Sequence, residues 1–255
     1  MIKTINLQCH LQGHTSPHQF NQVQGVVFDK DGTLAQSEGF LAHLARRRAR
    51  RVDAMVPGTQ EPLLLAFGVE RDHLNPSGLQ AVGSRYENMI AAAAYIAETG
   101  ISWFEARTLA QQAFAEADAH ESAKASQTPL IPGVMDLVQH LAAAAIPLAV
   151  LSADSTANVQ EFLQTYELDT YFTQARGIEP PLAKPDPAPL LHLCQDLGIA
   201  PAATLVIGDG DGDMAMAQRA GAMGLAVTWG WTVTPQFSQT NIVVDRPDAL
   251  QVVAG

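Results

Sequence analysis

Acidic and hydroxyl side chains follow three short apolar segments of this chain. Residues 29–34 (DKDGTL) follow the first segment, Ser152 ends the second, residues 208–213 (GDGDGD) end the third, and Lys184 stands in a Lys-Pro-Asp-Pro step. Several carboxylates in one crevice repel one another unless a cation joins them. Oxygen ligands alone favour Mg²⁺, and a lysine with backbone amides after the first two segments would neutralise a phosphate. The residue types therefore predict phosphoryl-transfer chemistry.

The segments between these residues predict a parallel α/β sheet. Short runs rich in Val, Ile and Leu, typical of buried parallel strands, occupy residues 23–28, 146–152, 204–208 and 223–228. Segments with helical spacing of apolar residues lie near 134–144, 155–165, 187–197 and 213–220. Strand alternating with helix indicates βαβ units with helices on both faces of the sheet. Ligands of such sheets bind outside the carboxyl ends of the strands, where the polar residues above would converge.

A helical insertion interrupts this alternation. Residues 36–127 contain no convincing strand, and alanine-rich helices are expected at about 37–56, 61–67, 85–98 and 102–125. Pro129 and the Pro132-Gly133 pair mark the return to the α/β body. We therefore predict an α/β core from residues 1–35 and 128–255, and a helical cap from residues 36–127.

The polar positions appear in the order typical of the haloacid dehalogenase (HAD) superfamily. The chain resembles its four motifs at Asp29-x-Asp31-Gly32-Thr33, then Ser152, then Lys184, then Asp209 with Asp213. The resemblance covers essentially the whole α/β body, and the helical insertion lies where the family places its first type of cap. It implies a Rossmann-like, three-layer core with a parallel sheet and an inserted all-helical cap. Within the superfamily, the chain most resembles the branch of phosphoglycolate phosphatases and β-phosphoglucomutases.

The resemblance implies roles for the two aspartates of the first motif. Asp29 would be the nucleophile that attacks phosphorus and forms an aspartyl-phosphate. Asp31 would protonate the leaving oxygen and later activate water. Residues i and i+2 of a strand share a face, so both side chains can reach one phosphate. Family members that cleave carbon–halogen bonds lack this second acid, so Asp31 favours phosphate ester hydrolysis over dehalogenation.

The resemblance also implies the metal and phosphate ligands. Mg²⁺ would be held by the Asp29 carboxylate, the Asp31 carbonyl and Asp209, and Asp213 would orient Lys184 or a water on the metal. Lys184 would offset charge on Asp29 and the phosphate. The phosphate would meet residues of the first two motifs, namely Gly32, Thr33, Ser152 and the amide of Ala153. Ala153 stands where many relatives carry Asn, so one hydrogen bond to the substrate is expected to be absent.

Two arginines of the helical insertion are further candidates for substrate binding. Arg48 belongs to a basic run but shares the helical stripe of Leu44 and Val52, so it either meets an anionic substrate or covers the stripe with its methylenes. Arg85 opens a helix behind a turn with free amides at residues 75–78, a typical anion-binding arrangement.

Other polar or aromatic features carry weaker signals. Asp211 is an extra carboxylate that either supports the metal or faces solvent. The histidines near Cys9 (His10, His14 and His18) suggest a metal site, but Gly13 and Pro17 break the helix that would align them, so a flexible or edge-pairing extension is favoured. Trp229 and Trp231 are expected to pack near the rim of the core.

Composition excludes several classes of protein. The 255 residues carry a formal charge of −11, which argues against a nucleic-acid surface, and no stretch is long and apolar enough for a membrane span. Two cysteines and the lack of a signal-peptide pattern predict a cytoplasmic setting. We therefore expect a Mg²⁺-dependent phosphatase of a small phosphorylated metabolite. A sugar-phosphate mutase of the β-phosphoglucomutase type and a non-catalytic module that binds a phosphate ligand stay open, as do the substrate and the oligomeric state.

Overall fold

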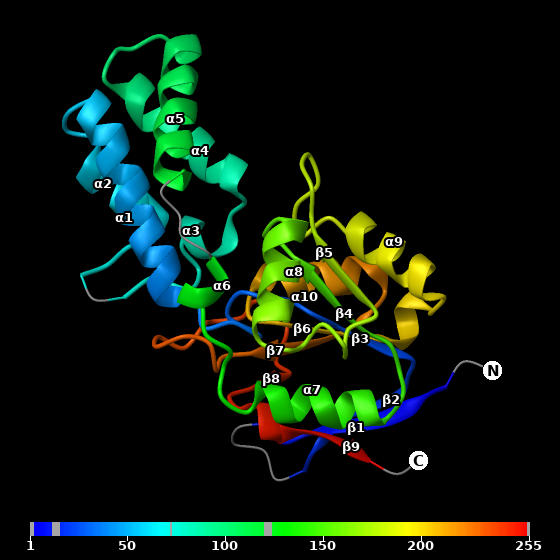
Figure 1. Cartoon of the computed structure of the whole chain (residues 1–255). Coiled ribbons are helices and arrows are strands. Elements are labelled where there is room, and N and C mark those ends of the chain that lie inside the picture. Colours follow the sequence, from blue (N-terminus) through cyan, green and yellow to red (C-terminus); the bar gives the residue numbers. More distant parts are fainter. Residues whose placement is uncertain (1–2, 12–15, 72, 120–123, 254–255) are drawn as a thin grey trace. The chain divides into compact units, whose positions relative to one another are not determined.

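The computed structural model describes residues 3–11, 16–71, 73–119 and 124–253. The chain forms two compact units (Figure 1). The first unit comprises Met1–Gln36, Thr128–Trp231 and Pro235–Gly255, and the second comprises Ser37–Gln127 with Thr232–Thr234. Among the described residues, no helix has the length and apolar character needed to cross a membrane.

A six-stranded sheet forms the centre of the first unit. Its order is β5-β4-β3-β6-β7-β8, and every neighbouring pair of strands is parallel. The strands are, in sheet order, β5 (Gln174–Gly177), β4 (Leu148–Ser152), β3 (Gly25–Phe28), β6 (Thr204–Gly208), β7 (Met223–Val227) and β8 (Val243–Val244). All residues of β3, β4 and β6 are buried, as expected of central parallel strands. The predicted Rossmann-like α/β class is thus confirmed.

Four helices connect or flank these strands, close to the predicted positions. They are α7 (Val134–Ala143), α8 (Thr156–Thr165), α9 (Ala188–Leu197) and α10 (Asp211–Ala220). Val27 and Val206 of the sheet pack with Leu190 of α9 and Met216 of α10 in one buried cluster. The apolar stripes of α9 and α10 therefore cover one face of the sheet.

Register brings the polar ends of three strands to one edge. Phe28 of β3 pairs with Val150 of β4 and with Ile207 of β6. Asp29 extends this ladder, because its amide donates to the Ile207 carbonyl (2.8 Å). Side chains one or two residues beyond the paired positions therefore meet at the carboxyl edge.

A second, three-stranded antiparallel sheet also belongs to the first unit, and the sequence did not predict it. Its order is β2-β1-β9, formed by β1 (Ile5–Cys9), β2 (His18–Val23) and β9 (Leu250–Val253). The N-terminal segment thus pairs as strands, one of the two expectations for it, but it does so in a separate sheet with β1 at the centre. The predicted strand 23–28 starts later, because Val23 pairs with Ile5 in β1. Two further strands were missed: β5 is only half-buried, and β8 has two residues.

Cys9 lies inside this second sheet. It pairs with His18 on one side and Leu250 on the other, and it is fully buried. Burial raises the pKa of its thiol to about 11, which disfavours the thiolate that binds metals. His14 and Gly13 lie outside the described residues. The pairing of Cys9 on both sides agrees with the edge-pairing alternative and not with the flexible one.

The second unit is helical. Its helices are α1 (Glu38–Met55), α2 (Gln60–Phe67), α3 (Leu79–Val82), α4 (Arg85–Glu98), α5 (Trp103–Asp118) and α6 (Lys124–Gln127). Ser84 and Glu87 form a capping box that starts α4, and Ser102 caps α5 by accepting from the Glu105 amide. The single helix predicted over residues 102–125 was wrong. The helix ends at Asp118, α6 begins at Lys124, and residues 120–123 lie outside the described residues.

A short C-terminal segment belongs to the helical unit, which the sequence did not suggest. The amide of Thr232 donates to Glu38 Oε2 and its hydroxyl to Glu38 Oε1, both over 2.8 Å. Glu38 Oε1 also accepts from the Leu74 amide (3.3 Å). This buried carboxylate in the first turn of α1 therefore fixes Thr232–Thr234 to the unit.

Candidate active site

Asp29 and Lys184 form an ion pair at the carboxyl edge of the six-stranded sheet. Lys184 Nζ lies 2.6 Å from Asp29 Oδ1 and 2.7 Å from Asp213 Oδ1. Both partners of the Asp29–Lys184 pair are about nine-tenths buried. Burial disfavours the charged ammonium, but Asp213 and Asp29 outweigh this effect and raise the pKa of Lys184. Lys184 is therefore a permanent cation at neutral pH.

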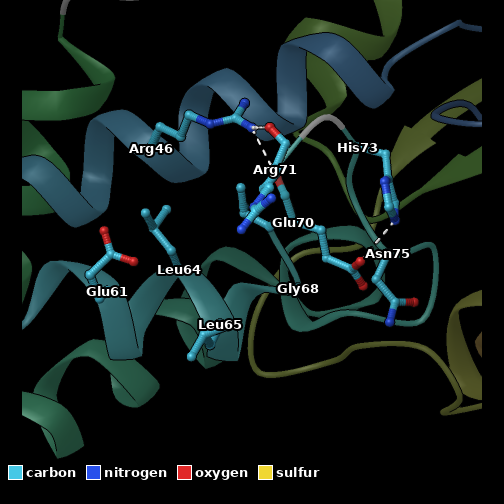
Figure 2. A pocket seen from close by; sticks show the side chains of 10 residues that line it. Arg46, Glu61, Leu64, Leu65, Gly68, Glu70, Arg71, His73 and Asn75 are labelled. Atoms are coloured by element: carbon cyan, nitrogen blue, oxygen red, sulfur yellow. Dashed lines mark hydrogen bonds and ion pairs between the residues drawn. The ribbon is translucent and has the colours of Figure 1, made fainter.

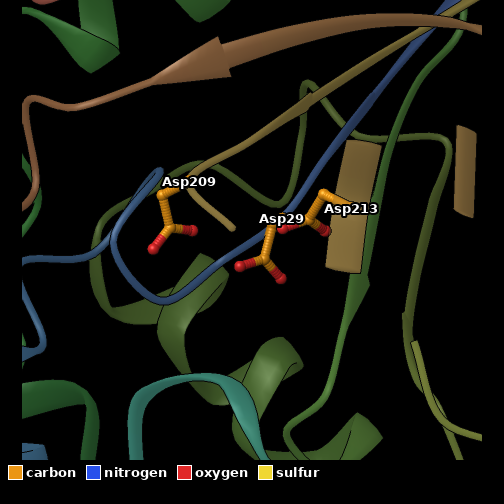
Figure 3. Close-up of side chains that lie close together, drawn as sticks. All are labelled: Asp29, Asp209 and Asp213. Carbon is orange, nitrogen blue, oxygen red and sulfur yellow. The ribbon is translucent and has the colours of Figure 1, made fainter. Parts of the chain in front are cut away.

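Three aspartates converge at this edge (Figure 3). Asp29, Asp209 and Asp213 are buried, and one oxygen of each lies within 4.8 Å of the others. Asp29 follows β3, Asp209 follows β6, and Asp213 lies in the first turn of α10. Asp213 Oδ2 accepts from the Gly210 amide (3.3 Å), which fixes its side chain at the start of the helix.

The crowding of these carboxylates changes their proton affinities. Burial raises the pKa of Asp209 well above its ordinary value, and the nearby Asp29 and Asp213 raise it further. Burial also raises the pKa of Asp213 to about 6, against the opposing effect of Lys184. Both shifts arise because the negative form is disfavoured in this setting.

The donor set fits a magnesium ion. Three buried carboxylates face one lysine ammonium, so two negative charges stay uncompensated when all groups are ionised. The raised pKa of Asp209 is the physical sign of this imbalance. Mg²⁺ binds oxygen ligands and takes one or two carboxylates from a protein, the rest of its shell being water and substrate. A divalent cation at this cluster would relieve the repulsion.

Asp31 points to a different partner. Its Oδ1 accepts from Lys30 Nζ (2.6 Å), and its side chain is 21% exposed, against 1% for Lys30. Lys30 Nζ also lies 3.1 Å from Asp154 Oδ2. No role for Lys30 or Asp154 was predicted from the sequence. The available signal was only the charge of Lys30 between the two motif aspartates, because position 30 lies beyond the predicted strand.

Gly32 and Thr33 shape the turn after β3. Gly32 has φ +79°, and a Cβ added there would overlap the Asp209 carboxylate. The Gly32 amide donates to the Ala35 carbonyl (2.8 Å) and the Thr33 amide to the Lys30 carbonyl (3.3 Å). The Thr33 hydroxyl donates to Asp209 Oδ1 (3.1 Å). In this structure both amides are thus used within the turn, and the Thr33 side chain supports the acidic cluster.

The two tryptophans after β7 hold the same region. Trp231 Nε1 donates to Asp209 Oδ2 (2.7 Å), and Trp229 Nε1 donates to the Thr33 carbonyl (2.9 Å). The Trp231 hydrogen bond favours the ionised carboxylate and partly offsets the raised pKa of Asp209. Both side chains were expected to pack near the rim of the core, and these hydrogen bonds were not predicted from the sequence. Two tryptophans so close to a strand end are the signal that was available.

Ser152 ends β4 and is almost fully buried. Its hydroxyl oxygen accepts from the Asp154 amide (3.2 Å), and the intervening Ala153 is exposed. Asp154 Oδ1 accepts from the Ser155 amide and from Asn158 Nδ2, both over 2.8 Å. This loop therefore joins the motif serine to an anchored aspartate.

Asp211 binds a loop of the same unit. Its carboxylate accepts from the Ser238 amide (3.0 Å) and hydroxyl (2.6 Å) and from the Gln239 amide (3.2 Å). It is not one of the three aspartates of the cluster. Neither expectation for Asp211 describes this contact, because the run 208–213 alone does not show that residues 238–239 lie against α10.

The two candidate arginines of the helical unit share one carboxylate. Arg48 Nη2 lies 3.0 Å from Asp118 Oδ1, and Arg85 Nε lies 2.6 Å from Asp118 Oδ2. Both guanidinium groups lie over the Phe114 ring. Arg48 is buried, whereas half of the Arg85 side chain is exposed. Asp118 therefore holds both guanidinium groups in one cluster.

The helical unit also contains an open hollow of about 770 Å³. Charges of both signs line it, together with apolar side chains of α2 (Figure 2). Arg46 Nη2 donates to the carbonyls of Glu70 and Arg71, each over 3.3 Å, and His73 Nε2 lies 3.1 Å from Glu70. Arg46 thus holds the loop after α2.

The fold and this edge define a class of α/β protein whose site lies at the carboxyl ends of parallel strands and combines buried aspartates with a lysine. A family model of haloacid dehalogenase-like hydrolases matches residues 23–221. The chain belongs to this family of hydrolases, and the predicted resemblance to the HAD superfamily is confirmed.

Named relatives extend this comparison. The chain is similar to a phosphoglycolate phosphatase of Psychrobacter arcticus, with 33% identity over 125 residues, which is 49% of this chain and 54% of the relative. That match therefore spans about half of the relative. A phosphoglycolate phosphatase of Synechococcus elongatus is 29% identical over 229 residues, or 89% of this chain and 92% of the relative. The crystal structure of a predicted phosphoglycolate phosphatase from Haemophilus somnus has a TM-score of 0.62 at 21% identity, covering 84% of this chain and 90% of that one.

Proposed function

We propose that this protein is a Mg²⁺-dependent phosphatase of a small phosphorylated metabolite, and that it acts through an aspartyl-phosphate on Asp29. One observation carries the proposal: Asp29 is paired with Lys184 through Oδ1, beside Asp209 and Asp213 and two residues before Asp31. Family membership and the phosphoglycolate phosphatases among the relatives support this reading. Phosphoglycolate is accordingly the first substrate to examine.

In the first step, an Asp29 carboxylate oxygen attacks phosphorus and the bond from phosphorus to the ester oxygen breaks. Lys184 binds Oδ1, so Oδ2 is the proposed attacking atom. Asp31 gives a proton to the leaving oxygen, and the alcohol departs. Water then attacks phosphorus, Asp31 takes its proton, and the bond between Asp29 and phosphorus breaks. Phosphate is released and both aspartates return to their initial states.

The remaining polar groups bind and neutralise the phosphate. Lys184 supplies a cation, and the Ser152 hydroxyl and the Ala153 amide are the proposed hydrogen-bond donors. Asp29, Asp209 and Asp213, with the Asp31 carbonyl, would hold Mg²⁺. When bound, Mg²⁺ supplies positive charge that offsets the charge gathering on the phosphoryl oxygens.

The inserted helical unit is the proposed cap, whose role would be to exclude bulk water while the aspartyl-phosphate forms. Arg85, half-exposed and sharing Asp118 with Arg48, is the candidate contact for an anionic group of the substrate. Arg48 is buried beside Phe114 and is the weaker candidate, because covering the apolar stripe accounts for its position.

A substrate screen tests the proposal. Purified protein with Mg²⁺ is incubated with a panel of small phosphate esters that includes phosphoglycolate, and released phosphate is measured. We expect steady release from at least one ester and none with Asp29→Asn. Absence of phosphate release from the whole panel would contradict the hydrolase assignment.

Two further assays separate the alternatives. A mutase uses Asp29 and Asp31 but returns the phosphoryl group, so it would interconvert sugar phosphates and require a sugar bisphosphate for activation. A binding module would retain phosphate esters in equilibrium dialysis without turnover. The presence of all motif residues favours an enzyme over a binding module.

A further inference from the structure

Lys30 is a fully buried lysine between the two aspartates of the first motif. Its side chain is 1% exposed, and its Nζ lies 5.6 Å from the centroid of the Phe162 ring of α8. Burying an ammonium is costly unless carboxylates and hydrogen bonds compensate for the lost water. Two carboxylates do so here: Asp31 at 2.6 Å and Asp154 at 3.1 Å.

Asp154 is itself fixed. Its Oδ1 accepts two hydrogen bonds, from the Ser155 amide and from Asn158 Nδ2 at the start of α8. Its other oxygen, Oδ2, faces Lys30. The backbone of Asp154 is tied to Ser152 through the bond from its amide to the serine hydroxyl. Lys30 is thus held from one side by an aspartate whose position is set by β4 and α8.

We propose that Lys30 is a positioning residue for Asp31, and that Asp154 anchors it. This inference rests on the proposed function, in which Asp31 transfers the proton. A carboxylate at a turn has free rotation about two bonds, so only some orientations place its oxygen near the leaving group. The Asp154–Lys30 pair restricts Asp31 to a narrow set of orientations, because Lys30 Nζ binds Asp31 Oδ1 while Asp154 Oδ2 holds the same ammonium. Each bond of this network lies within the first unit.

The dependence of kcat/KM on the leaving group distinguishes positioning of Asp31 from a purely structural role of Lys30. An alkyl phosphate expels a strongly basic alkoxide and needs the proton from Asp31, whereas 4-nitrophenyl phosphate expels a weakly basic phenolate and needs it little. Loss of positioning should therefore lower kcat/KM far more for alkyl than for aryl esters. Loss of packing should lower both equally.

The experiment measures kcat/KM for a series of aryl and alkyl phosphates with wild type, Lys30→Met, Asp154→Asn and Asp31→Asn. For Lys30→Met we expect a loss of about tenfold to hundredfold on alkyl esters and less than about threefold on 4-nitrophenyl phosphate. Asp154→Asn keeps the amide-facing oxygen and leaves Lys30 paired with Asp31, so it folds even if Lys30→Met does not. It should show the same trend with a smaller loss.

A double-mutant cycle completes the test. In an Asp31→Asn background, Lys30→Met should cause no further loss that depends on the leaving group, because the residue it positions is already gone. The packing control is Phe162→Leu, which removes the ring beside Lys30 and should keep the wild-type dependence on the leaving group. Equal losses on aryl and alkyl esters for both Lys30→Met and Asp154→Asn, or a leaving-group effect that persists without Asp31, would overturn the proposal.

This outcome is distinct from failure of the proposed function. If wild type hydrolyses the series and Asp29→Asn does not, the proposed phosphatase function is supported independently of the result for Lys30. If wild type hydrolyses no ester of the series, the phosphatase proposal fails, and the positioning role fails with it.

Discussion

Lys184 Nζ lies 2.6 Å from Asp29 Oδ1, although 155 residues separate them in the chain. The same ammonium lies 2.7 Å from Asp213 Oδ1, so one cation joins the residue after β3 to the first turn of α10. The pair sets the charge at the candidate nucleophile, because Lys184 stays protonated there.

The first prediction concerns the nucleophile. Asp29→Asn should abolish hydrolysis of 4-nitrophenyl phosphate, with a loss of at least about a thousandfold in kcat, because an amide does not attack phosphorus. The fold should persist, because Asn is isosteric and Lys184 keeps Asp213 as partner. Circular dichroism and thermal unfolding check the fold. Turnover close to that of wild type would remove Asp29 from its role.

The second prediction concerns the metal and pH. EDTA should abolish phosphatase activity, and added Mg²⁺ should restore this activity and raise Tm. Asp213 has a pKa raised from 3.8 to about 6, so the folded chain binds more protons than the unfolded chain in that window. The stability contributed by this group therefore falls as pH rises from about 4 to about 6 in the metal-free protein.

Mg²⁺ needs the deprotonated carboxylates, so its effect on Tm should be small at about pH 5 and larger at about pH 7.5. Thermal unfolding with EDTA and with Mg²⁺ at the two pH values measures this difference. An equal increase of Tm with Mg²⁺ at both pH values, or full activity in EDTA, would refute Mg²⁺ binding by the acidic cluster.

The third prediction concerns Gly32. In Gly32→Ala, the added methyl would overlap the Asp209 carboxylate, and φ +79° would be strained. We expect weaker Mg²⁺ binding and a lower kcat. The free energy of unfolding should also fall by about 1–2 kcal/mol because of the strained backbone alone. Gly198→Ala is the matched control, because Gly198 has φ +67° with no atom near its absent side chain. If both variants bind Mg²⁺ as wild type does, the contact with Asp209 is unimportant.

The fourth prediction concerns Trp231. Trp231→Phe removes the indole donor that favours ionised Asp209, so the pKa of Asp209 should rise further and Mg²⁺ should bind more weakly near neutral pH. The affinity should recover as pH increases. Trp229→Phe serves as the control, because that indole donates to a backbone carbonyl and not to a carboxylate. Identical Mg²⁺ titrations of the two variants would argue against an effect through Asp209.

The fifth prediction concerns Arg85. Arg85→Ala should raise KM for the true substrate with little change in kcat. The free energy of unfolding should change by less than about 1 kcal/mol, because the side chain is half-exposed and Arg48 still neutralises Asp118. Unchanged kinetics on that substrate would remove Arg85 from the site.

Helices and strands that have a local sequence pattern were predicted well. The strands β3, β4, β6 and β7 and the helices that follow them lie within a few residues of the expected ranges, because buried runs and helical stripes are local patterns. The antiparallel sheet was missed, because β1 and β9 pair across almost the whole chain and β1 mixes polar with apolar residues. The break after Asp118 was missed because alanine-rich sequence continues past it.

By itself, the sequence determined the class of chemistry. The residue types and their order along the chain predict it, and the residues concerned are Asp29, Asp31, Ser152, Lys184 and Asp209. Only the tertiary structure decided which side chains touch. It brings Trp231 to Asp209, turns Asp211 toward residues 238–239, and joins Lys30 to Asp154. The physical reason is that hydrogen bonds and ion pairs depend on distances of a few ångströms between segments far apart in the chain. Spacing along one segment carries no such information.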